Sequence, residues 1–309
     1  MGPVPSVESG PGVRVRVPAK VNLHLGVRDL RDDGFHELVT VFQAIDLADE
    51  VTARPAVGLT VRVSGEGSAH VPTDPQNIAW RAAAMLAEHA HVPPDALLDI
   101  TKAIPVAGGM AGGSADAAAT LVACATLWRT RTSRADLLDL AARLGSDVAF
   151  PLLGGTALGT GRGEVLTPAL TTGRLHWVLA LAAFGISAGD AYRELDRQRA
   201  AGDARQPAGR PEVLLDALRA GDPHRAGAAL TNDLQPAALA LAPSLRRTLT
   251  AGADLGAIAG IVCGSGPTCA FLCADARAAN RLAASLAAEG VCRTTRVAVG
   301  PVPGARVVG

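Results

Sequence analysis

Residues 105–119 read PVAGGMAGGSADAAA, and more of the architecture follows from this stretch than from any other part of the chain. Two glycine pairs, Gly108-Gly109 and Gly112-Gly113, lead into an alanine-rich run that predicts a helix. The apolar run LLDITKAI at residues 97–104, directly before this stretch, predicts a strand. Glycine lets the backbone approach a ligand closely, and the free N–H groups at a helix start favour an anion. The order strand, glycine loop, helix therefore predicts a phosphate-binding element.

The composition narrows the class of protein. The chain has 309 residues, 49% of them hydrophobic, with 29 basic and 29 acidic side chains and 3% aromatic residues. This length is enough for two domains. Balanced charge and few aromatics argue against a nucleic-acid surface, and no apolar run is long enough to span a bilayer. The N-terminus also lacks the pattern of a secretory signal. We expect a cytoplasmic monomer or homodimer with no nucleic-acid or membrane partner.

Two residue types are unusually distributed. The five cysteines form no CxxC pair and mostly lie in apolar runs, which predicts buried, reduced thiols without a metal site. Lysine occurs only at Lys20 and Lys102, and every other basic residue is arginine. Each lysine marks either a place that needs a compact ammonium or a chance survival. The cysteines are Cys124, Cys263, Cys269, Cys273 and Cys292.

The N-terminal part predicts strands and turns. Residues 13–25 alternate as one or two strands broken at Pro18. Beyond the break, Lys20, Asn22 and His24 share one face, which is either solvated or lines a cleft. Asp33-Gly34 predicts a turn between extended segments.

Further along, helices are predicted at 78–89 and at 133–144, where Ser133 and Asp136 approximate a capping box. The glycine-rich residues 144–164 favour turns between short strands, and 196–211 a polar connection. Near the end, two apolar strands joined by GSGPT at 264–268 precede a helix at 275–289 and another strand. The GSGPT turn is either a plain hairpin or a second anion-binding element.

Three segments carry a family resemblance: PAKVNLHLG at 18–26, PVAGGMAGGSADAA at 105–118 and CGSGPT at 263–268. The first glycine loop lacks the Gly-Lys-Ser/Thr ending of a Walker A loop, and the VAIK and HRD elements of protein kinases are absent. In this order the three segments resemble those of the GHMP kinases. The resemblance implies an α+β fold: after a flexible leader at 1–12, a ribosomal-protein-S5-like α/β domain at 13–167 and a ferredoxin-like α+β domain at 168–309, with the active site between them.

The resemblance extends to one branch of that family through DDGFHEL, LGSDVAF, GTGRGE and TNDLQ. That branch transfers the γ-phosphoryl group of ATP, with Mg²⁺, to the 2-hydroxyl of a cytidine-diphosphate-linked methylerythritol. Two alternatives stay open. One is another GHMP kinase, acting on mevalonate or homoserine; the other is a non-catalytic nucleotide-binding sensor of the same fold.

The resemblance also implies roles for single residues. Asp147 takes the proton of the substrate hydroxyl, and Lys20 beside it holds the carboxylate ionised and stabilises the charge that develops. By its pattern alone, Asp147 is as well explained as a turn or helix-start residue. Ser114 bonds a phosphate or a metal-bound water, and no side chain ligates the metal directly. The residues implied in ATP binding are Lys102, Pro105, Val106, Ala107, Gly108, Gly109, Met110, Ala111, Gly112, Gly113, Ser114 and Ala115.

The implied substrate contacts come from three regions. His36 reads the cytosine edge, and Phe35 and Tyr192 flank the base; for Tyr192 the alternative is a helix residue packing on the core. Asn22, Gly264 and Ser265 complete the set. The chain departs from the family pattern at four places. Ala107 and Ala111 stand where glycine is common, Ala115 where a second serine is common, and Ala149, after Asp147-Val148, where proline is expected.

Overall fold

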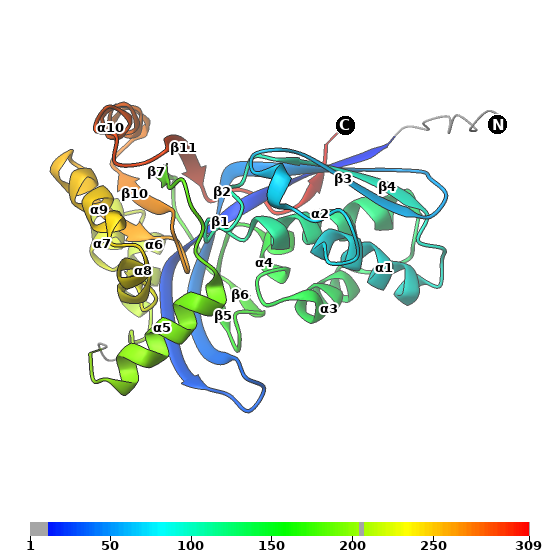
Figure 1. Cartoon of the computed structure of the whole chain (residues 1–309), viewed down its shortest axis with the longest axis horizontal. Coiled ribbons are helices and arrows are strands. Elements are labelled where there is room, and N and C mark those ends of the chain that lie inside the picture. Colours follow the sequence, from blue (N-terminus) through cyan, green and yellow to red (C-terminus); the bar gives the residue numbers. More distant parts are fainter. Residues whose placement is uncertain (1–11, 204–206, 309) are drawn as a thin grey trace.

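The computed structural model describes residues 12–203 and 207–308, so the predicted leader lies outside the described residues except for Gly12. Two sheets organise the described chain (Figure 1). The larger has the strand order β12-β1-β2-β4-β3, with β5, β6 and β8 attached, and the smaller has the order β11-β7-β10-β9. This mixed α/β architecture is the one that the sequence predicts.

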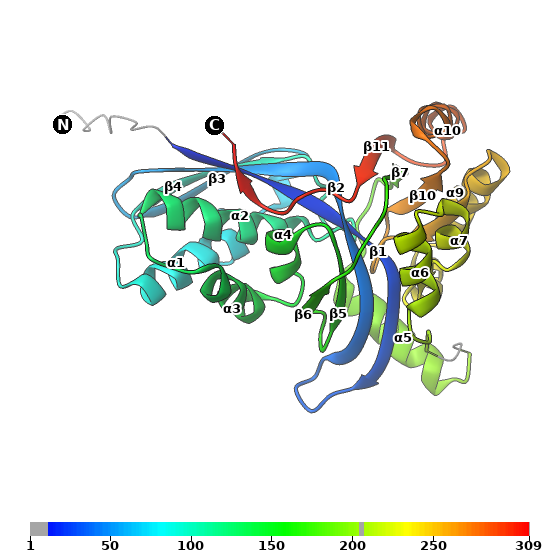
Figure 2. The same ribbon diagram turned by 180° about the vertical axis from the view of Figure 1, so that it is seen from behind.

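A long hairpin of β1 (Val13–Leu30) and β2 (His36–Arg54) runs through the larger sheet and curves down the middle of the molecule (Figures 1 and 2). Gly34 takes φ +80° in the connecting turn, as the Asp33-Gly34 pair predicts. Pro18 does not break β1. Instead, the pairing with β2 shifts register between Pro18 and Ala19, a β-bulge that tolerates the missing proline N–H.

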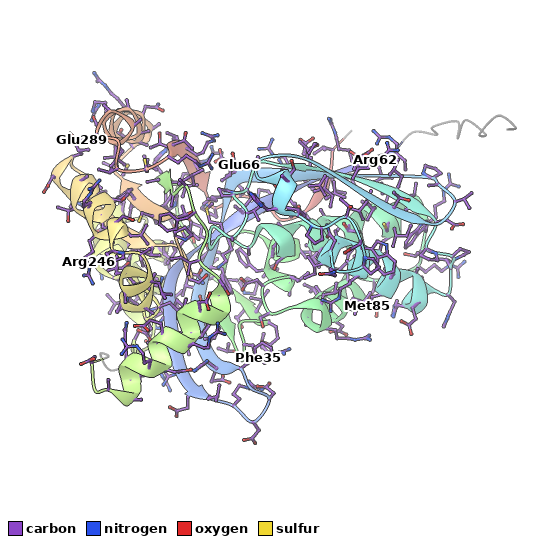
Figure 3. The ribbon with its side chains drawn as sticks, in the orientation of Figure 1. Phe35, Arg62, Glu66, Met85, Arg246 and Glu289 are labelled. Atoms are coloured by element: carbon purple, nitrogen blue, oxygen red, sulfur yellow. The ribbon has the colours of Figure 1, made fainter. Side chains whose placement is uncertain are left out.

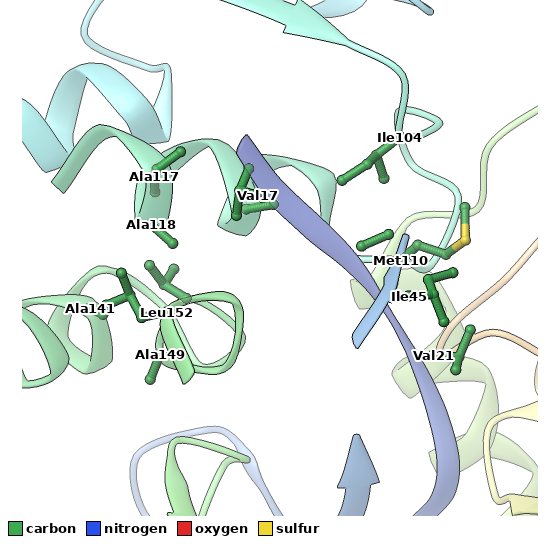
Figure 4. Packing of buried hydrophobic residues seen from close by; sticks show 14 of the residues in the cluster. Val17, Val21, Ile45, Ile104, Met110, Ala117, Ala118, Ala141, Ala149 and Leu152 are labelled. Atoms are coloured by element: carbon green, nitrogen blue, oxygen red, sulfur yellow. The ribbon is translucent and has the colours of Figure 1, made fainter. Parts of the chain in front are cut away.

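Four helices cover one face of the larger sheet, and alanine-rich α2 packs directly on the strands. In Figure 4, Ile45 of the hairpin lies near Met110, and Ala118 of α2 points toward Leu152, whereas Ala117 points to the other side of the helix. Small alanine side chains let the helix and sheet backbones approach closely. The further elements of this part are β3 (Leu59–Gly65), η1 (Ser68–His70), α1 (Ile78–Ala90), β4 (Ala96–Lys102), α2 (Gly112–Leu127), α3 (Arg134–Leu144), α4 (Ala149–Leu153), β5 (Thr156–Thr160) and β6 (Val165–Pro168).

The predicted helices and the strand before the glycine loop are confirmed here, including the capping box of Ser133 and Asp136. The prediction for residues 144–164 is wrong in one respect, because α4 lies between the turns. This helix is only one turn and a half long, too short to show a helical period. Its buried residues Phe150 and Leu152 stabilise it by packing rather than by propensity.

The second part of the chain supplies the smaller sheet and the helices beside it (Figure 1). The predicted strands around GSGPT form an antiparallel hairpin. The expectation of a polar connection from 196 is wrong for its first residues, because α5 continues to Ala200 with Ala191 and Leu195 buried on one face. The elements are β7 (Leu175–Leu181), α5 (Ala188–Ala200), α6 (Glu212–Ala220), α7 (Pro223–Ala228), β8 (Thr231–Asn232), α8 (Gln235–Leu241), α9 (Ser244–Asp254), β9 (Ala259–Val262), β10 (Cys269–Cys273), α10 (Ala276–Ala288), β11 (Thr294–Gly300) and β12 (Arg306–Val307).

Strand pairing and a buried hydrogen bond connect the two parts of the chain, in addition to the covalent chain itself. β8 pairs in parallel with β1, and β12 pairs antiparallel with its start, so the second half of the chain adds strands to the larger sheet. Between the sheets, Trp177 Nε1 donates a hydrogen bond of 3.1 Å to the buried Gln43 Oε1. All five cysteines are free and four are buried. None of the described helices is long and apolar enough to cross a membrane.

Candidate active site

The phosphate loop connects β4 to α2 and takes an unusual backbone path. Ala107, Gly109 and Ala111 have φ of 52°, 78° and 59°, in the left-handed region that favours glycine. Two of these positions are the places where the chain has alanine instead of the expected glycine. Together with His70 and Asn77, the loop lines a cavity of about 410 Å³, which we call the loop cavity.

Lys102 lies beneath this loop in a buried charge cluster. Its Nζ donates to Asp49 and, at 2.5 Å, to Asp116 Oδ2 of α2. Asp49 Oδ1 also accepts from the backbone N–H groups of Ala103 and Ile104, at 2.6 and 2.8 Å. The cluster therefore ties β2, β4 and α2 together at the point where the loop starts and ends. Lys102 also lines the loop cavity, where it is expected to meet the nucleotide.

Asp116 is a site residue that the sequence reasoning missed. It is 3% exposed and lines the loop cavity, and burial raises its pKa to about 8 although Lys102 acts in the opposite direction. Its Oδ1 has no hydrogen-bond partner in the described part of the chain. The available signal was a carboxylate in the first turns of an otherwise apolar helix, directly after the glycine loop.

The second glycine loop, between β9 and β10, packs against the first. A Cβ on Gly109 would lie 2.0 Å from the carbonyl oxygen of Cys263, and a Cβ on Gly264 would lie 2.9 Å from that of Gly109. Real Cβ atoms do not approach so closely, so only glycine fits at both positions. The two loops therefore meet backbone to backbone, and Gly264 and Ser265 line a central cavity of about 290 Å³ with Lys20, Asn22 and Asp147.

Lys20 and Asp147 come together in this central cavity. Lys20 Nζ lies 3.6 Å from Asp147 Oδ2, and the lysine is buried whereas Asp147 is partly exposed. Lys20 Nζ also donates a 2.6 Å hydrogen bond to Asn22 Oδ1, and Asn22 Nδ2 donates to Thr40 Oγ1 at 2.9 Å. The ring of Phe42 lies under the ammonium, 5.5 Å from its centroid. These contacts fix the ammonium beside the carboxylate.

The prediction that His24 shares the face of Lys20 and Asn22 is wrong. A second register shift between Asn22 and His24 turns the strand, so that Leu25 rather than His24 lines the central cavity. His24 is buried, its Nε2 has no hydrogen-bond partner in the described residues, and burial lowers its pKa. A bulge moves the side chains that follow it in the strand to the opposite face of the sheet, and the alternation of polar and apolar residues in the sequence does not reveal the bulge.

A third cavity, of about 560 Å³, lies beside the tip of the β1–β2 hairpin, and we call it the hairpin cavity. His36 and Tyr192 stack there with ring centroids 5.2 Å apart, and His36 Nε2 is 2.9 Å from Asp196 Oδ1 of α5. Phe35 is half-exposed near α5 (Figure 3), with the Arg162 guanidinium 5.0 Å from its ring centroid. The three aromatic residues expected at the base thus line one cavity, together with Arg162 and Asp196, which the sequence reasoning did not single out.

The three cavities meet at a few shared residues. Asp147 lines both the central and the hairpin cavity, and Ser114 lines both the hairpin and the loop cavity. Ala111 lines the central and loop cavities. A phosphorylated ligand along the glycine loop and a second ligand at the hairpin would therefore both reach the Lys20–Asp147 pair, the arrangement that group transfer between two ligands needs.

The fold and the two facing glycine loops define a GHMP kinase. The family model of the GHMP kinases N terminal domain matches residues 77–155, and that of the GHMP kinases C terminal domain matches residues 214–292. The chain is 60% identical to the 4-diphosphocytidyl-2-C-methyl-D-erythritol kinase of Rhodococcus jostii (strain RHA1), over 96% of this chain and 95% of that one. The kinase of the same name from Mycobacterium tuberculosis (strain H37Rv) is 57% identical over 96% of this chain and 93% of its own length. The chain belongs to the 4-diphosphocytidyl-2-C-methyl-D-erythritol kinase family.

Solved structures agree with this assignment. A crystal structure of 4-(cytidine 5'-diphospho)-2C-methyl-D-erythritol kinase superposes with a TM-score of 0.76 at 30% identity, covering 92% of this chain and 98% of that one. A homoserine kinase from Cytophaga hutchinsonii gives a TM-score of 0.75 at 18% identity, with both chains covered completely. At this low identity the homoserine kinase shows the shared fold alone.

Proposed function

We propose that the chain is the ATP-dependent kinase that phosphorylates the 2-hydroxyl of 4-diphosphocytidyl-2-C-methyl-D-erythritol in the non-mevalonate isoprenoid precursor pathway. The relatives with 57–60% identity carry the name of this kinase. The observation that carries the mechanism is the position of Asp147, 3.6 Å from Lys20 and on the border between the central and hairpin cavities.

In this mechanism the loop cavity holds ATP and the hairpin cavity holds the cytidylyl group. The stacked His36 and Tyr192, with Phe35, offer the aromatic surface and ring nitrogens that suit a cytosine. Asp147 accepts the proton of the substrate 2-hydroxyl. At the same time the hydroxyl oxygen forms a bond to the γ-phosphorus of ATP, and the bond from that phosphorus to the leaving ADP breaks. Lys20 faces the negative charge of the phosphoryl group, held in place by its hydrogen bond to Asn22.

Mg²⁺ accompanies ATP in this proposal. The donor set of the loop cavity fits it, because the Ser114 hydroxyl and the unpartnered Asp116 Oδ1 are hard oxygen atoms in the same cavity. Both would hold the ion through its water ligands. The ion supplies neutralisation of phosphate charge.

We also propose a cytoplasmic location and a monomeric or homodimeric state. Free cysteines, four of them buried, suit a reducing compartment. ATP as co-substrate points to the same compartment.

The function is tested by an ATP-dependent turnover assay with three acceptors: the cytidylyl methylerythritol, mevalonate and homoserine. We expect turnover of the first alone. Turnover of another acceptor without the first would overturn the assignment, and ATP binding without turnover of any acceptor would favour a nucleotide sensor. The catalytically impaired Asp147→Asn variant serves as the background control for contaminating kinases.

A further inference from the structure

The TNDLQ segment, residues 231–235, has no role in the mechanism above, yet it lies where β1 and the second glycine loop meet. β8 pairs in parallel with β1, with Thr231 opposite His24 and Asn232 opposite Leu25. Asn232 is 8% exposed. The backbone of Asn232 is therefore fixed to the strand that also carries Lys20 and Asn22.

The side chain of Asn232 forms hydrogen bonds to the second glycine loop and to the end of β9 before it. Its Nδ2 donates to the carbonyl oxygens of Val262 at 2.8 Å and of Gly264 at 2.7 Å, while its Oδ1 accepts from the N–H of Leu234 at 2.9 Å. Only an amide provides two donor hydrogens and an acceptor in this geometry. Asn232 thus holds two carbonyl groups, one on either side of Cys263, turned toward itself.

The hydrogen bond from Asn232 to the Gly264 carbonyl sets the direction of the next N–H group, that of Ser265. In a trans peptide the carbonyl oxygen and the next N–H point in opposite directions, and the cis peptides of the described chain precede Pro267 and Pro301 only. With the Gly264 carbonyl turned to Asn232, the Ser265 N–H points away from Asn232, and both residues of this peptide line the central cavity. Within the described residues this N–H has no acceptor, whereas the Cys263 N–H donates to the Thr268 carbonyl at 2.8 Å.

The surroundings of this N–H favour an anion. A Cβ on Gly264 would lie 3.3 Å from Lys20 Nζ, so the peptide stands directly beside the buried ammonium. We infer that Asn232 is a positioning residue, which turns the Ser265 N–H into the central cavity as a donor to an oxygen of the phosphoryl group in transfer. A donor fixed in advance at the place where charge develops costs no reorganisation during the reaction. The inference rests on the proposed kinase function.

The Asn232→Asp variant tests the inference. It keeps the shape and the acceptor for Leu234 but removes both donor hydrogens. We expect kcat for the cytidylyl substrate to fall at least tenfold, with the Kd for ATP, measured by calorimetry, within threefold of wild type. The matched control is Asp233→Asn at the neighbouring position, whose carboxylate accepts from Val27 and Ala208 and does not touch the loop; its kcat should stay within threefold.

Two results would overturn the positioning role: an Asn232→Asp kcat within threefold of wild type, or a parallel loss of kcat and ATP affinity, which indicates general damage to the site. If wild type itself fails to phosphorylate the cytidylyl substrate, the proposed function is at fault instead.

A measurement on the unaltered enzyme covers the case in which the variant does not fold. With ¹⁵N-serine labelling, hydrogen exchange of the Ser265 amide should slow at least tenfold when ADP, aluminium fluoride and the cytidylyl substrate are added together. Exchange at an unchanged rate in that complex contradicts the inference.

Discussion

Two lysines in a chain rich in arginine both lie in buried ionic contacts of the site. Lys20 is 5% exposed and Lys102 4% exposed, and each pairs with carboxylates through its single compact ammonium. A planar guanidinium needs more room and a forked partner. The rarity of lysine therefore marked both positions in the sequence for a physical reason, although it did not reveal that Lys102 serves two aspartates.

The role of Asp147 leads to the first prediction. In Asp147→Asn the amide can no longer accept the hydroxyl proton, so kcat should fall by about 10²–10⁴-fold, the usual contribution of a positioned base. ATP binding should persist, because the loop cavity is lined by other residues. Steady-state turnover and calorimetric ATP titration check both points. A variant with wild-type turnover excludes Asp147 as the base.

The buried Asp116 leads to a pH prediction. Its pKa is raised by burial from 3.8 to about 8, so between these values the folded state holds a proton that the unfolded state has released. The stability contributed by Asp116 therefore decreases as pH rises through this window. In Asp116→Asn this loss is absent, and the Tm of the variant relative to wild type should increase from pH 5 to pH 8 in the absence of nucleotide.

The control for this experiment is Asp136→Asn in the exposed capping box. Hydrogen bonds to Ser133 lower the pKa of Asp136 below 3.8, so its contribution is constant from pH 5 to pH 8. Its Tm difference from wild type should not change over that range. A pH-independent difference for Asp116→Asn as well would show that Asp116 is already ionised in the folded protein.

At the scale of elements, the contact between the two glycine loops leads to a prediction on Gly109. A Cβ there would lie 2.0 Å from the Cys263 carbonyl oxygen, at φ +78°. Overpacking and left-handed strain together cost about 2–5 kcal/mol. Gly109→Ala should lower the free energy of unfolding by this amount and weaken ATP binding, as urea titration and calorimetry can measure.

Gly113→Ala is the matched stability control, because its Cβ would lie 3.6 Å from Ile78 in ordinary contact. Alanine is the better helix former, so this variant should gain about 0.5–1 kcal/mol. Equal losses for both glycine variants would contradict the close packing of the loops.

The sequence predicted those elements whose pattern is local. The strand, loop and helix around residue 110, the capping box at Ser133 and the hairpin at 264–268 all follow from short-range signals, and the structure contains them. The bulge that turns His24 away from the central cavity does not follow from short-range signals, because it depends on the pairing of β1 with β2. The one-and-a-half-turn α4 and the Asp49–Lys102–Asp116 cluster likewise depend on partners distant in the chain. Asp147 and Tyr192 were placed by family resemblance alone, because no pattern near them indicates a role, whereas the glycine loop and the two lysines stand out in the sequence itself.

At the scale of the whole molecule, the buried joint between the two sheets leads to a further prediction. Trp177→Phe removes the donor to Gln43 Oε1, and a buried acceptor without a partner costs about 1–3 kcal/mol. The loss should appear in urea unfolding followed by circular dichroism. The matched control Trp128→Phe removes an exposed bond to the Asp95 carbonyl, which water can replace, and should cost less. Equal costs would mean that the joint is open to solvent.

The return of the C-terminus to β1 has a consequence for synthesis on the ribosome. Val308 donates to the Arg14 carbonyl at 2.8 Å, and Ala305 donates to that of Pro151 at 2.7 Å, so residues 305–308 close a sheet whose first strand begins at Val13. Domains ordinarily fold in order as they emerge. Here the larger sheet lacks β12 until Arg306 and Val307 have left the exit tunnel, and until then β1 has an open edge at Val15 and Arg16.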